Sequence, residues 1–529
     1  MSPLTKRRLA SFFLILGPIL AWLMMAMYSS GTGLRELRWR SILHWAMITP
    51  DYPFMWGTLI IGFLFGIAAT FWIGRAYKTE GFEGAGFTRF IRGTRVVSAK
   101  RLAKICRNRW GSTKQLNVAG IPMPRKVENL HFLVAGATGT GKSILMRDLV
   151  YSALKRGDRA LIVDPNGDML SKFYRPGDKI LNPYDTRTEG WVFFNDVRKD
   201  YDWKRISRSI VPMAEDKNSE EWNDYGRLLL RETAKKLYSA GINDIKEVFN
   251  YCTIIDDKQL RAYLTGTLAE SLFAGSSEAS KALTSARFVL SNKLSEHTSM
   301  PAGHFSIREW MADPNGGNLF INWREDMATA MKPLVSCWVD VFLQELLSMP
   351  PSQQRRWVLS LDELASLDAL SSLVDGLTKG RKAGAMIFAG LQSTAQLDYI
   401  YGKTMSQVIR ASFRSLTVLG GSNTDSQTAE DLSKALGEHE VERPDYSVSH
   451  SNSGRNTSDK IIRIRERVVM PSEIQKFEEM TGYVSFAGNF PIAKVEMKFQ
   501  HYAEHTPAFL ENDQVFAVPQ NLANIHPAP

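Results

Sequence analysis

The chain of 529 residues is long enough for two to four domains, and its 44% hydrophobic and 23% charged residues are typical of a globular protein with large cores. The formal net charge of +10 indicates a polyanionic partner or a membrane surface. The three cysteines, Cys106, Cys252 and Cys337, are far apart and form no CxxC motif, which argues against a zinc site and fits a reducing compartment.

Two apolar runs near the N-terminus predict membrane-spanning helices. Residues 9–28 and 53–74 carry no charged side chain, and each run is long enough to cross about 30 Å of hydrocarbon as a helix. The first run is longer than a typical signal core and no clear cleavage site follows it, so we expect a helical hairpin with a short loop over residues 29–52. Seven basic residues flank the outer ends of the pair and three lie in the loop, which favours both ends in the cytoplasm.

The second run carries small residues at four-residue spacing: Thr58, Gly62, Gly66, Thr70 and Gly74. Small residues at this spacing form one face of a helix and let another helix approach closely. The face fits either self-association or docking on a membrane partner, or packing against the first run within the hairpin. The sequence favours neither.

A strongly basic segment follows the second run. Between Glu83 and Glu128 there are eleven Lys and Arg residues and no Asp or Glu, so this segment alone accounts for the excess positive charge. Its basic residues are Arg89, Arg92, Arg95, Lys100, Arg101, Lys104, Arg107, Arg109, Lys114, Arg125 and Lys126. The position next to a membrane span fits contact with anionic lipid headgroups or a topology signal; nucleic acid binding and a solvated basic face are the alternatives.

The stretch GATGTGKS fits the phosphate-loop motif GxxxxGK[ST] at every fixed position. An apolar run that predicts a buried strand precedes it and a helical pattern follows it, which is the context that the motif needs. Lys142 is expected to reach the β- and γ-phosphates and Ser143 to bind Mg²⁺, while backbone N–H groups of the loop point at phosphate oxygens. The candidate nucleotide-binding residues are Gly136, Ala137, Thr138, Gly139, Thr140, Gly141, Lys142 and Ser143.

A second apolar run, WVLSLDE, ends in two carboxylates. Its composition is that of a buried parallel strand, so Asp362 is expected to hold the Mg²⁺ shell and Glu363 to polarise the attacking water. The pair indicates hydrolysis, with ATP and Mg²⁺ as cofactors, rather than nucleotide binding alone. The alternative is that both residues cap the helix that follows.

Two further predicted strands end in polar residues. DRALIVDPNGD places Asp164 and Asp168 just past one strand, and AMIFAGLQS ends another at Gln392. Groups at the carboxyl ends of parallel strands line the ligand crevice of an α/β sheet. Gln392 is therefore a candidate sensor of the γ-phosphate, with a simple helix cap as the alternative.

The segment TKGRKAG, residues 378–384, lies between the acidic strand and the Gln392 strand. A basic loop flanked by glycines at this place fits an arginine that enters the nucleotide site of a neighbouring subunit, where it stabilises charge during phosphoryl transfer. Arg381 is the candidate. The alternative is a surface loop with local ion pairs.

The spacing of the motifs predicts an inserted domain. Lys142 and Asp362 are 220 residues apart, more than a minimal sheet of this type needs, and the residues between them are rich in helical patterns. The expected domains are a transmembrane domain of residues 1–75, a nucleotide-binding domain of residues 76–190 and 305–505, and an all-α insert of residues 191–304.

After Glu440 the sequence becomes polar and poor in apolar residues. Residues 443–460 are polar and are expected to form a mobile loop, whereas residues 481–497 predict a closing hairpin with Gly-Asn at its turn. Residues 506–529 show no periodic pattern and are expected to be a disordered tail.

With these motifs in view, the chain resembles the type IV coupling proteins of bacterial conjugation, the TraD/TrwB type. The runs that carry the resemblance extend to about residue 505 and include AGATGTGKS, VDPNGDMLSKF, ILNPYD, RLLLRETAKKL, LDELASL, LTKGRKAG and AGLQSTAQL. The resemblance implies an α/β fold: a RecA-like P-loop NTPase domain with an inserted all-α domain, preceded by a two-helix transmembrane hairpin. It also implies a homo-hexamer in which Arg381 acts on the neighbouring subunit and Gln392 senses phosphate.

The resemblance further implies a function. Such a protein is an ATPase of the bacterial inner membrane, with both termini and most of the chain in the cytoplasm, that links a relaxase–DNA complex to a type IV secretion channel and pumps single-stranded DNA. The implied partners are single- and double-stranded DNA without sequence preference, relaxase and relaxosome proteins, channel proteins and the membrane. Alternatives are an ATP-switched docking receptor for protein cargo and a chromosome-segregation translocase, although the tail is too short for the DNA reader of the latter.

Overall fold

The computed structural model describes residues 3–33, 37–76, 87, 89–110, 115–214, 217–451 and 454–512. Two units emerge from the contacts within the chain: Met1–Arg95 with Gly437–Val468, and Val96–Leu436 with Val469–Pro529. This division differs from the expected one, because residues 437–468 group with the N-terminal part and not with the nucleotide-binding domain. Lys114 of the basic segment and the expected tail beyond residue 512 lie outside the described residues.

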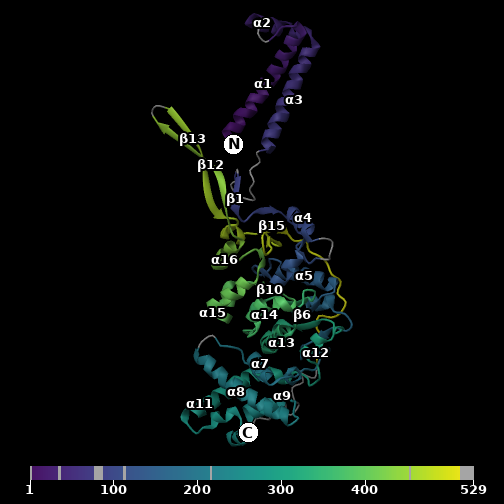
Figure 1. The fold of residues 1–529 in the computed structure, drawn as a ribbon, viewed down its shortest axis with the longest axis vertical. Helices are drawn as coiled ribbons and strands as arrows, with labels where there is room; N and C mark the ends of the chain where they lie inside the picture. The colour runs from purple at the N-terminus through teal and green to yellow at the C-terminus, as the bar shows by residue number, and fades with distance from the viewer. Residues whose placement is uncertain are drawn as a thin grey trace, which may run out of the picture. The chain divides into compact units, whose positions relative to one another are not determined.

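Both apolar runs of the first unit are helical, as the sequence predicts. α1 (Pro3–Ser30) and α3 (Pro53–Ala76) lie side by side (Figure 1). The windows Ser11–Ser30 and Pro53–Trp72 are long and apolar enough to cross a membrane. Together the two helices form the expected hairpin.

The link between these helices contains more structure than the expected short loop. It holds α2 (Trp39–Ile48) and the 3₁₀ turn η2 (Thr49–Asp51). The indole Nε1 of Trp22 donates a hydrogen bond of 3.0 Å to the Thr49 hydroxyl, and Trp45 is buried against the end of α1. The N-cap residue of α2, Arg38, makes no capping hydrogen bond through its side chain, and it is not one of the residue types that normally mark a helix start.

The stripe of small residues on α3 packs within the hairpin. A Cβ atom added at Gly62 would lie 2.6 Å from the Cα of Pro18, and one added at Gly66 would lie 2.6 Å from the carbonyl oxygen of Phe13. Two glycines therefore let α1 approach the α3 backbone directly. Of the two roles that the sequence leaves open, the structure shows packing against the first helix.

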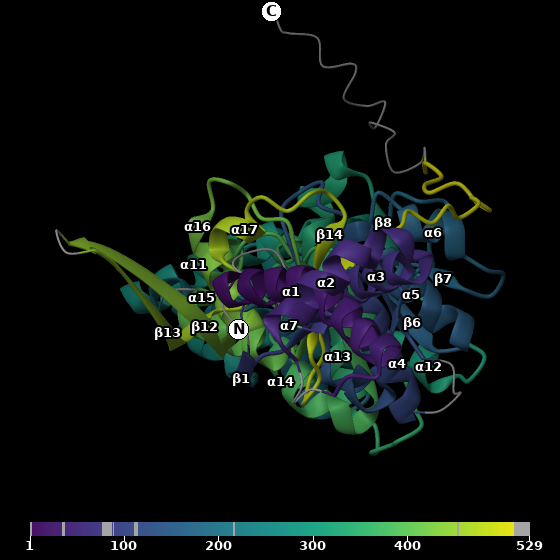
Figure 2. The ribbon, with the colours of Figure 1, turned by 90° about the horizontal axis from the view of Figure 1, so that it is seen from above.

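A three-stranded antiparallel sheet completes this unit. β1 (Arg89–Gly93) pairs with β12 (Glu438–Ser451), which pairs in turn with β13 (Gly454–Arg467). β12 and β13 extend as a long two-stranded ribbon (Figure 1 and Figure 2).

The ribbon shows that the expectation of a mobile loop over residues 443–460 is wrong. A two-stranded ribbon needs no apolar face, because opposite charges on facing strands can stabilise it. Arg443, at the start of this segment, contacts Glu466 at 2.6 Å, and just beyond the segment Arg463 contacts Glu442 at 3.3 Å and Arg465 contacts Glu438 at 2.5 Å. The composition of such strands is therefore as polar as that of a loop, which explains the error.

A ten-stranded mixed sheet forms the centre of the second unit. From edge to edge its strands are β2 (Val96–Ser98), β15 (Ile492–Glu496), β14 (Thr481–Ser485), β11 (Ser415–Leu419), β5 (Phe132–Ala135), β10 (Ala385–Leu391), β9 (Trp357–Leu361), β6 (Arg159–Pro165), β8 (Leu319–Trp323) and β7 (Lys179–Ile180). The strands from β11 to β7 are parallel, and β14 runs antiparallel to both of its neighbours. The β14–β15 pair is the hairpin that the sequence predicts.

Alternating side chains of the central strands separate two hydrophobic cores. Phe132 and Val134 of β5 belong to one core and Leu133 to the other, and Ile162 and Leu161 of β6 divide in the same way. The first core is covered by α4 (Ala99–Trp110), α5 (Lys142–Arg156) and α6 (Asp168–Phe173). The second is covered by α12 (Ile307–Ala312), α13 (Ala328–Ser348), α14 (Leu373–Lys379) and α15 (Thr394–Ser412).

A group of helices enters the chain between β7 and β8. Its helices are α7 (Asp200–Ile210), α8 (Lys217–Ser239), α9 (Ile245–Phe249), α10 (Asp257–Leu264) and α11 (Ser277–Leu294). Their buried side chains, such as Leu229 and Leu290, continue the second core without a break. The buried carboxylate of Asp340 on α13 also accepts a hydrogen bond of 2.5 Å from Ser209 on α7, so polar contacts join the two parts as well.

The first residues of the expected disordered tail are packed. The backbone N–H of Thr506 donates to the carbonyl of Ser171 at 3.3 Å, and the Asn322 side chain donates to the carbonyl of Ala508 at 2.8 Å. Phe509 lies against the second core. Residues 506–512 are therefore part of the fold, held by partners distant in sequence that a local pattern does not reveal.

Candidate nucleotide-binding site

The GATGTGKS loop joins β5 to α5. Gly139 and Gly141 have φ angles of 81° and 100°, a conformation that favours glycine, and a Cβ at Gly136 would lie 2.8 Å from Leu419 Cβ. No side chain caps the start of α5. The first N–H groups of this 15-residue helix thus remain available to an anion, as a phosphate cradle requires.

Lys142 is held inside this loop. Its Nζ donates to the carbonyl oxygens of Gly136 at 2.9 Å and Ala137 at 3.2 Å. Burial lowers the pKa of Lys142, while the nearby carboxylates of Glu363 and Asp362 act in the opposite direction. The ammonium group therefore sits where the sequence places it, between the loop and two acids.

Ser143 and Asp362 meet at the carboxyl ends of the central strands. The Ser143 hydroxyl donates to Oδ2 of Asp362 at 2.8 Å, while Oδ1 of Asp362 is buried with no hydrogen-bond partner among the described residues. Burial raises the pKa of Asp362, and the hydrogen bond from Ser143 and the charge of Lys142 lower it. A hydroxyl beside a carboxylate with a spare oxygen is the kind of hard-oxygen donor set that Mg²⁺ takes together with phosphate oxygens and water.

Gly390 explains how close the two central strands come at this point. A Cβ there would lie 1.8 Å from the carbonyl oxygen of Asp362, so only glycine fits. The motifs of the sequence predict no role for Gly390. Its signal is the glycine inside the apolar run AMIFAGL, a pattern that indicates close approach of another backbone.

Glu363 and Gln392 lie together at the carboxyl ends of β9 and β10. Burial raises the pKa of Glu363 to about 7; Lys142 lowers it, Asp362 raises it and a hydrogen bond with Gln392 lowers it. Oε1 of Glu363 is buried and has no partner within the described part of the chain. The geometry offers one free carboxylate oxygen next to Lys142, which suits a group that must accept a proton or a hydrogen bond from water.

We expect nucleotide hydrolysis to depend on the ionisation of Glu363. Because burial raises the pKa of this carboxyl to about 7 and the role predicted for it from the sequence requires the ionised form, kcat/KM should rise as pH increases through about 7. The measurement is the ATPase rate at low ATP and excess Mg²⁺ across this range. Gln392→Ala removes a hydrogen bond that lowers the pKa of Glu363, so the midpoint of the pH–rate profile of this variant should move to higher pH. A wild-type rate that does not change with pH in this range would contradict the assignment.

Arg381 is the predicted residue that the structure does not bring to this site. It lies in the 3₁₀ turn η10 (Gly380–Ala383), before the first residue of β10, and its side chain is exposed. Glu363 follows the last residue of the parallel strand β9. The seven residues of β10 span roughly 23 Å, so Arg381 lies at the amino ends of the parallel strands, opposite the carboxyl ends where Glu363 of the same chain lies.

The acids that follow β6 contribute less directly than the sequence suggests. Burial raises the pKa of Asp164 to about 7, against hydrogen bonds from Leu170 and Met169 that lower it. Its Oδ2 accepts from the Leu170 backbone at 2.7 Å, so this carboxylate holds the first turn of α6. Asp168 is half-exposed and pairs with Arg147 on α5 at 3.2 Å.

A segment that no sequence motif predicts covers the phosphate loop. The Met480 backbone N–H donates to the carbonyl of Thr140 at 3.1 Å, and a Cβ at Gly141 would lie 2.8 Å from Cε of Met497. Met480 directly precedes the β14–β15 hairpin and Met497 directly follows it. Nothing local in the sequence marks this contact, because the partners are more than 300 residues apart.

A glycine loop between β5 and α5 of a parallel sheet, with Asp362–Glu363 after β9, the next strand but one, defines a P-loop NTPase. Comparison with known proteins then gives the family. Residues 115–498 match the model described as "Type IV secretion-system coupling protein DNA-binding domain". The chain belongs to the type IV secretion-system coupling proteins, which confirms the resemblance seen in the sequence.

Solved structures support the same conclusion. The bacterial conjugative coupling protein TrwBdeltaN70 is 59% identical, with a TM-score of 0.77 over 82% of this chain and 98% of that chain. TrwB in complex with ADP and Mg²⁺ is 58% identical, with a TM-score of 0.76 over 82% of this chain and all of that chain. These matches confirm the expected RecA-like fold with an all-α part.

A full-length relative extends beyond this chain. The coupling protein TraD of Escherichia coli (strain K12) is 30% identical over 426 residues, which are 76% of this chain and 57% of TraD. The chain thus spans little more than half the length of that relative.

Proposed function

We propose that this chain is a membrane-anchored ATPase that couples DNA to a type IV secretion channel and pumps single-stranded DNA during conjugation. One observation supports hydrolysis above all: Asp362 and Glu363 lie beside Lys142 and Ser143, and each has one buried carboxylate oxygen that no described residue contacts by a hydrogen bond. A similar protein, TrwB, has been solved with ADP and Mg²⁺, with an ATP analogue and with a GTP analogue. These complexes support ATP with Mg²⁺ as the substrate and cofactor here.

The residues of the site have distinct proposed tasks. The backbone of residues 136–143 and the ammonium of Lys142 bind the phosphates, and Ser143 with Asp362 holds Mg²⁺. The bound metal ion neutralises charge that develops on the phosphates. Glu363 accepts the hydrogen bond of the attacking water, and Gln392 holds that carboxylate and senses the γ-phosphate.

The proposed assembly is a homo-hexamer in which nucleotide sites lie at subunit boundaries. Arg381 lies at the opposite end of the strands from Glu363 of the same chain, so it cannot act in that site. Its side chain is exposed and can enter the site of a neighbouring subunit. A ring completed in this way couples hydrolysis to the relative movement of subunits around a central pore.

The proposed partners follow from charge and from the apolar helices. DNA contact is expected mainly at phosphates, so binding should tolerate any sequence and weaken as salt increases. For single-stranded DNA, the logarithm of the binding constant should fall by about 0.7 for each neutralised phosphate when the salt concentration rises tenfold. We propose that α1 and α3 anchor the chain in the bacterial inner membrane with both termini in the cytoplasm. The further proposed partners are relaxase and relaxosome proteins, which bring the DNA, and the channel proteins of the secretion system, which receive it.

We expect single-stranded DNA to raise the ATPase rate of the detergent-solubilised full-length protein several-fold. The physical reason is that DNA in the pore stabilises the assembled ring, in which each site is complete. Lys142→Ala should abolish both the basal and the stimulated rate, because it removes the positive charge that binds the β- and γ-phosphates. An ATPase rate that does not respond to DNA would favour the docking-receptor alternative.

A further inference from the structure

The segment of residues 364–372 follows Glu363 and joins β9 to α14. Every third residue from its start is a leucine of the second core, each at most 3% exposed: Leu364, Leu367 and Leu370. The segment also contacts Glu363 directly, because the backbone N–H of Ala365 donates a hydrogen bond to the Glu363 carboxylate. The direction of that carboxylate therefore depends on where the segment lies.

Side chains of α13 and α15 hold the backbone of this segment. The hydroxyl of Ser336 on α13 accepts a hydrogen bond of 2.9 Å from the N–H of Asp368. The hydroxyl of Tyr401 on α15 accepts one of 3.1 Å from the N–H of Leu370. Residues 367–372 form no helix or strand, so their N–H groups need such partners when they are removed from water.

Asp340 on α13 joins this segment to the inserted helices. Its residue is only 1% exposed. Its carboxylate accepts hydrogen bonds of 2.7 Å from the backbone N–H of Ser372 and 2.7 Å from the hydroxyl of Ser371. The same carboxylate accepts from the side chain of Gln344 at 2.8 Å and from the hydroxyl of Ser209 on α7 at 2.5 Å. One buried group thus connects two residues of the segment with a helix of the insert.

These contacts are strong enough to fix the segment. Hydrogen bonds to a carboxylate are about twice as strong as bonds between neutral groups, and loss of the acceptor would leave buried donors without a partner. A second contact supports the connection to the insert, because Lys293 on α11 pairs with Asp368 at 3.0 Å. Two of the inserted helices therefore contact the segment that holds Glu363, either directly or through Asp340.

We propose that Asp340 is a positioning residue for ATP hydrolysis. It fixes residues 364–372 so that Glu363 keeps the direction in which it accepts the hydrogen bond of the attacking water. Its bond to Ser209 makes this direction depend on the inserted helices as well. The inference rests on the proposed function, since it assigns a supporting residue to Glu363. A displacement of about 1 Å at a reacting group can cost about 100-fold in rate, so a small shift of the segment is sufficient.

The test separates hydrolysis from nucleotide binding in full-length protein in detergent. Asp340→Asn keeps the size of the side chain, but its amide nitrogen accepts no hydrogen bond, so some of the four donors lose their partner. We expect kcat to fall about 100-fold, while KM and the Kd of a fluorescent non-hydrolysable ATP analogue change by less than about twofold.

Two serine variants test the same role with smaller changes. Ser371→Ala and Ser209→Ala each remove one hydrogen bond to Asp340 and should lower kcat about fivefold, with a Tm close to that of the wild type. Ser371→Thr keeps the hydroxyl and should restore kcat. If Asp340→Asn does not fold, these variants decide, and an unchanged kcat in both would overturn the proposal.

Hydrogen exchange followed by mass spectrometry gives a measurement that does not use hydrolysis. The backbone N–H groups of Asp368, Leu370 and Ser372 are hydrogen-bonded, so they should exchange slowly in the wild type. In Asp340→Asn, exchange of a peptide that covers residues 364–372 should become at least about fivefold faster. In Ser209→Ala it should also become faster, because the insert then no longer holds Asp340.

The matched control is a second buried carboxylate in the same part of the molecule. Asp196 accepts hydrogen bonds of 2.7 Å from the indole of Trp191 and 2.8 Å from the hydroxyl of Ser306. Asp196→Asn removes an equally buried charge that makes no described hydrogen bond to residues 364–372. It should lower Tm about as much as Asp340→Asn, yet leave kcat and the exchange of that peptide unchanged.

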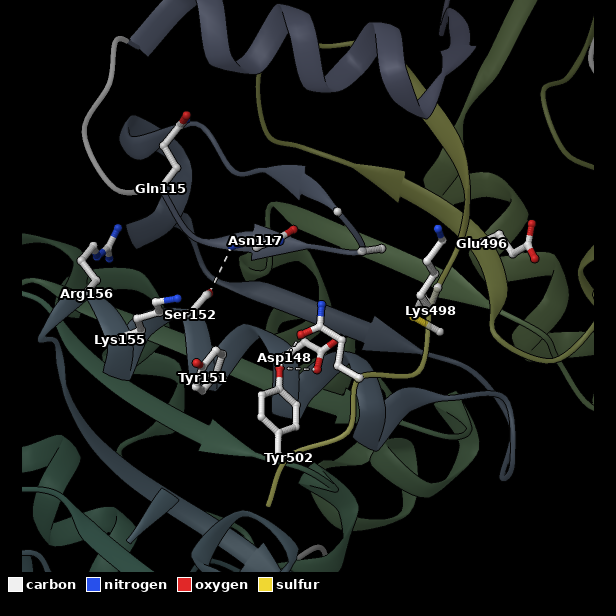
Figure 3. A pocket seen from close by; sticks show the side chains of 14 residues that line it. Gln115, Asn117, Asp148, Tyr151, Ser152, Lys155, Arg156, Glu496, Lys498 and Tyr502 are labelled. Carbon is white, nitrogen blue, oxygen red and sulfur yellow. Dashed lines mark hydrogen bonds between the residues drawn. The ribbon is translucent and has the colours of Figure 1, made fainter. Parts of the chain in front are cut away.

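A further control lies on the other face of the sheet, close to the phosphate loop in the chain. Asp148 on α5 lines a cavity of about 600 Å³, where it accepts a hydrogen bond of 2.9 Å from Tyr502 (Figure 3). Asp148→Asn should leave kcat unchanged, because this carboxylate belongs to the helix of the phosphate loop and not to the contacts of residues 364–372.

The outcomes distinguish the proposal from the function on which it rests. Wild-type kcat and slow exchange in Asp340→Asn would overturn the positioning role, and so would an equal loss of kcat in Asp340→Asn and Asp196→Asn. A wild-type protein that hydrolyses no ATP would overturn the proposed function itself.

Discussion

Glu363→Gln is expected to lower the rate of ATP hydrolysis by about 10²- to 10⁴-fold while ATP still binds. Glutamine keeps the shape of the side chain but cannot accept the proton of the attacking water. Lys142, Ser143 and Asp362 remain in place to bind the nucleotide and its metal ion. Hydrolysis is measured with the purified protein, and plasmid transfer with a mating assay between donor and recipient cells.

Transfer frequency decides what the loss of hydrolysis means. If hydrolysis drives DNA through the channel, transfer should fall together with the ATPase rate. Glu309→Gln is the matched control, because this exposed glutamate on α12 is outside the site and its substitution should leave both measurements unchanged. Normal plasmid transfer in Glu363→Gln cells would contradict the proposed pump.

Arg381→Ala is expected to reduce the ATPase rate of the assembled protein by about 10³-fold, the lower end of the effect known for arginines that act across a subunit boundary. The sharper experiment mixes this variant with Lys142→Ala. Each variant alone is inactive, but a boundary that joins the intact loop of one variant to the intact Arg381 of the other is complete. The mixture should therefore recover a measurable fraction of wild-type activity.

The mixing experiment has a control and two outcomes that would contradict the role of Arg381. Lys382→Ala changes the adjacent exposed cation and should keep full activity. A mixture that stays inactive although both variants assemble would show that Arg381 does not act on a neighbour. Full activity of Arg381→Ala alone would leave it as a surface residue of η10, the alternative that the sequence allows.

How much the sequence predicts depends on how local each interaction is. The GATGTGKS loop and the Asp362–Glu363 pair are recognisable because a strand, a turn and a helix follow one another within about twenty residues. The apolar runs of α1 and α3 are visible for the same reason. In each case the chemistry and its structural context lie in one stretch of chain.

The errors concern structure held by distant partners. The β12–β13 ribbon is stabilised by ion pairs between its strands, such as Arg465–Glu438. The sequence of these strands has the polar composition of a loop, and the pairs become apparent only when the strands are aligned. Met497 touches Gly141 from the far end of the chain, and Thr506 is tied to Ser171. None of these contacts has a periodic signal, because the two partners meet only after the sheet has formed.

The continuous second core has a mechanical consequence. Apolar side chains run from Leu133 in the middle of the sheet through α13 to Leu290 in α11, so swinging the helical insert outward would expose this surface to water at about 25 cal/mol for every Å². This free-energy cost argues against a hinge between the sheet and the inserted helices. In the proposed hexamer, the nucleotide-binding part and the inserted helices of one subunit should therefore move together as one rigid body relative to the neighbouring subunits.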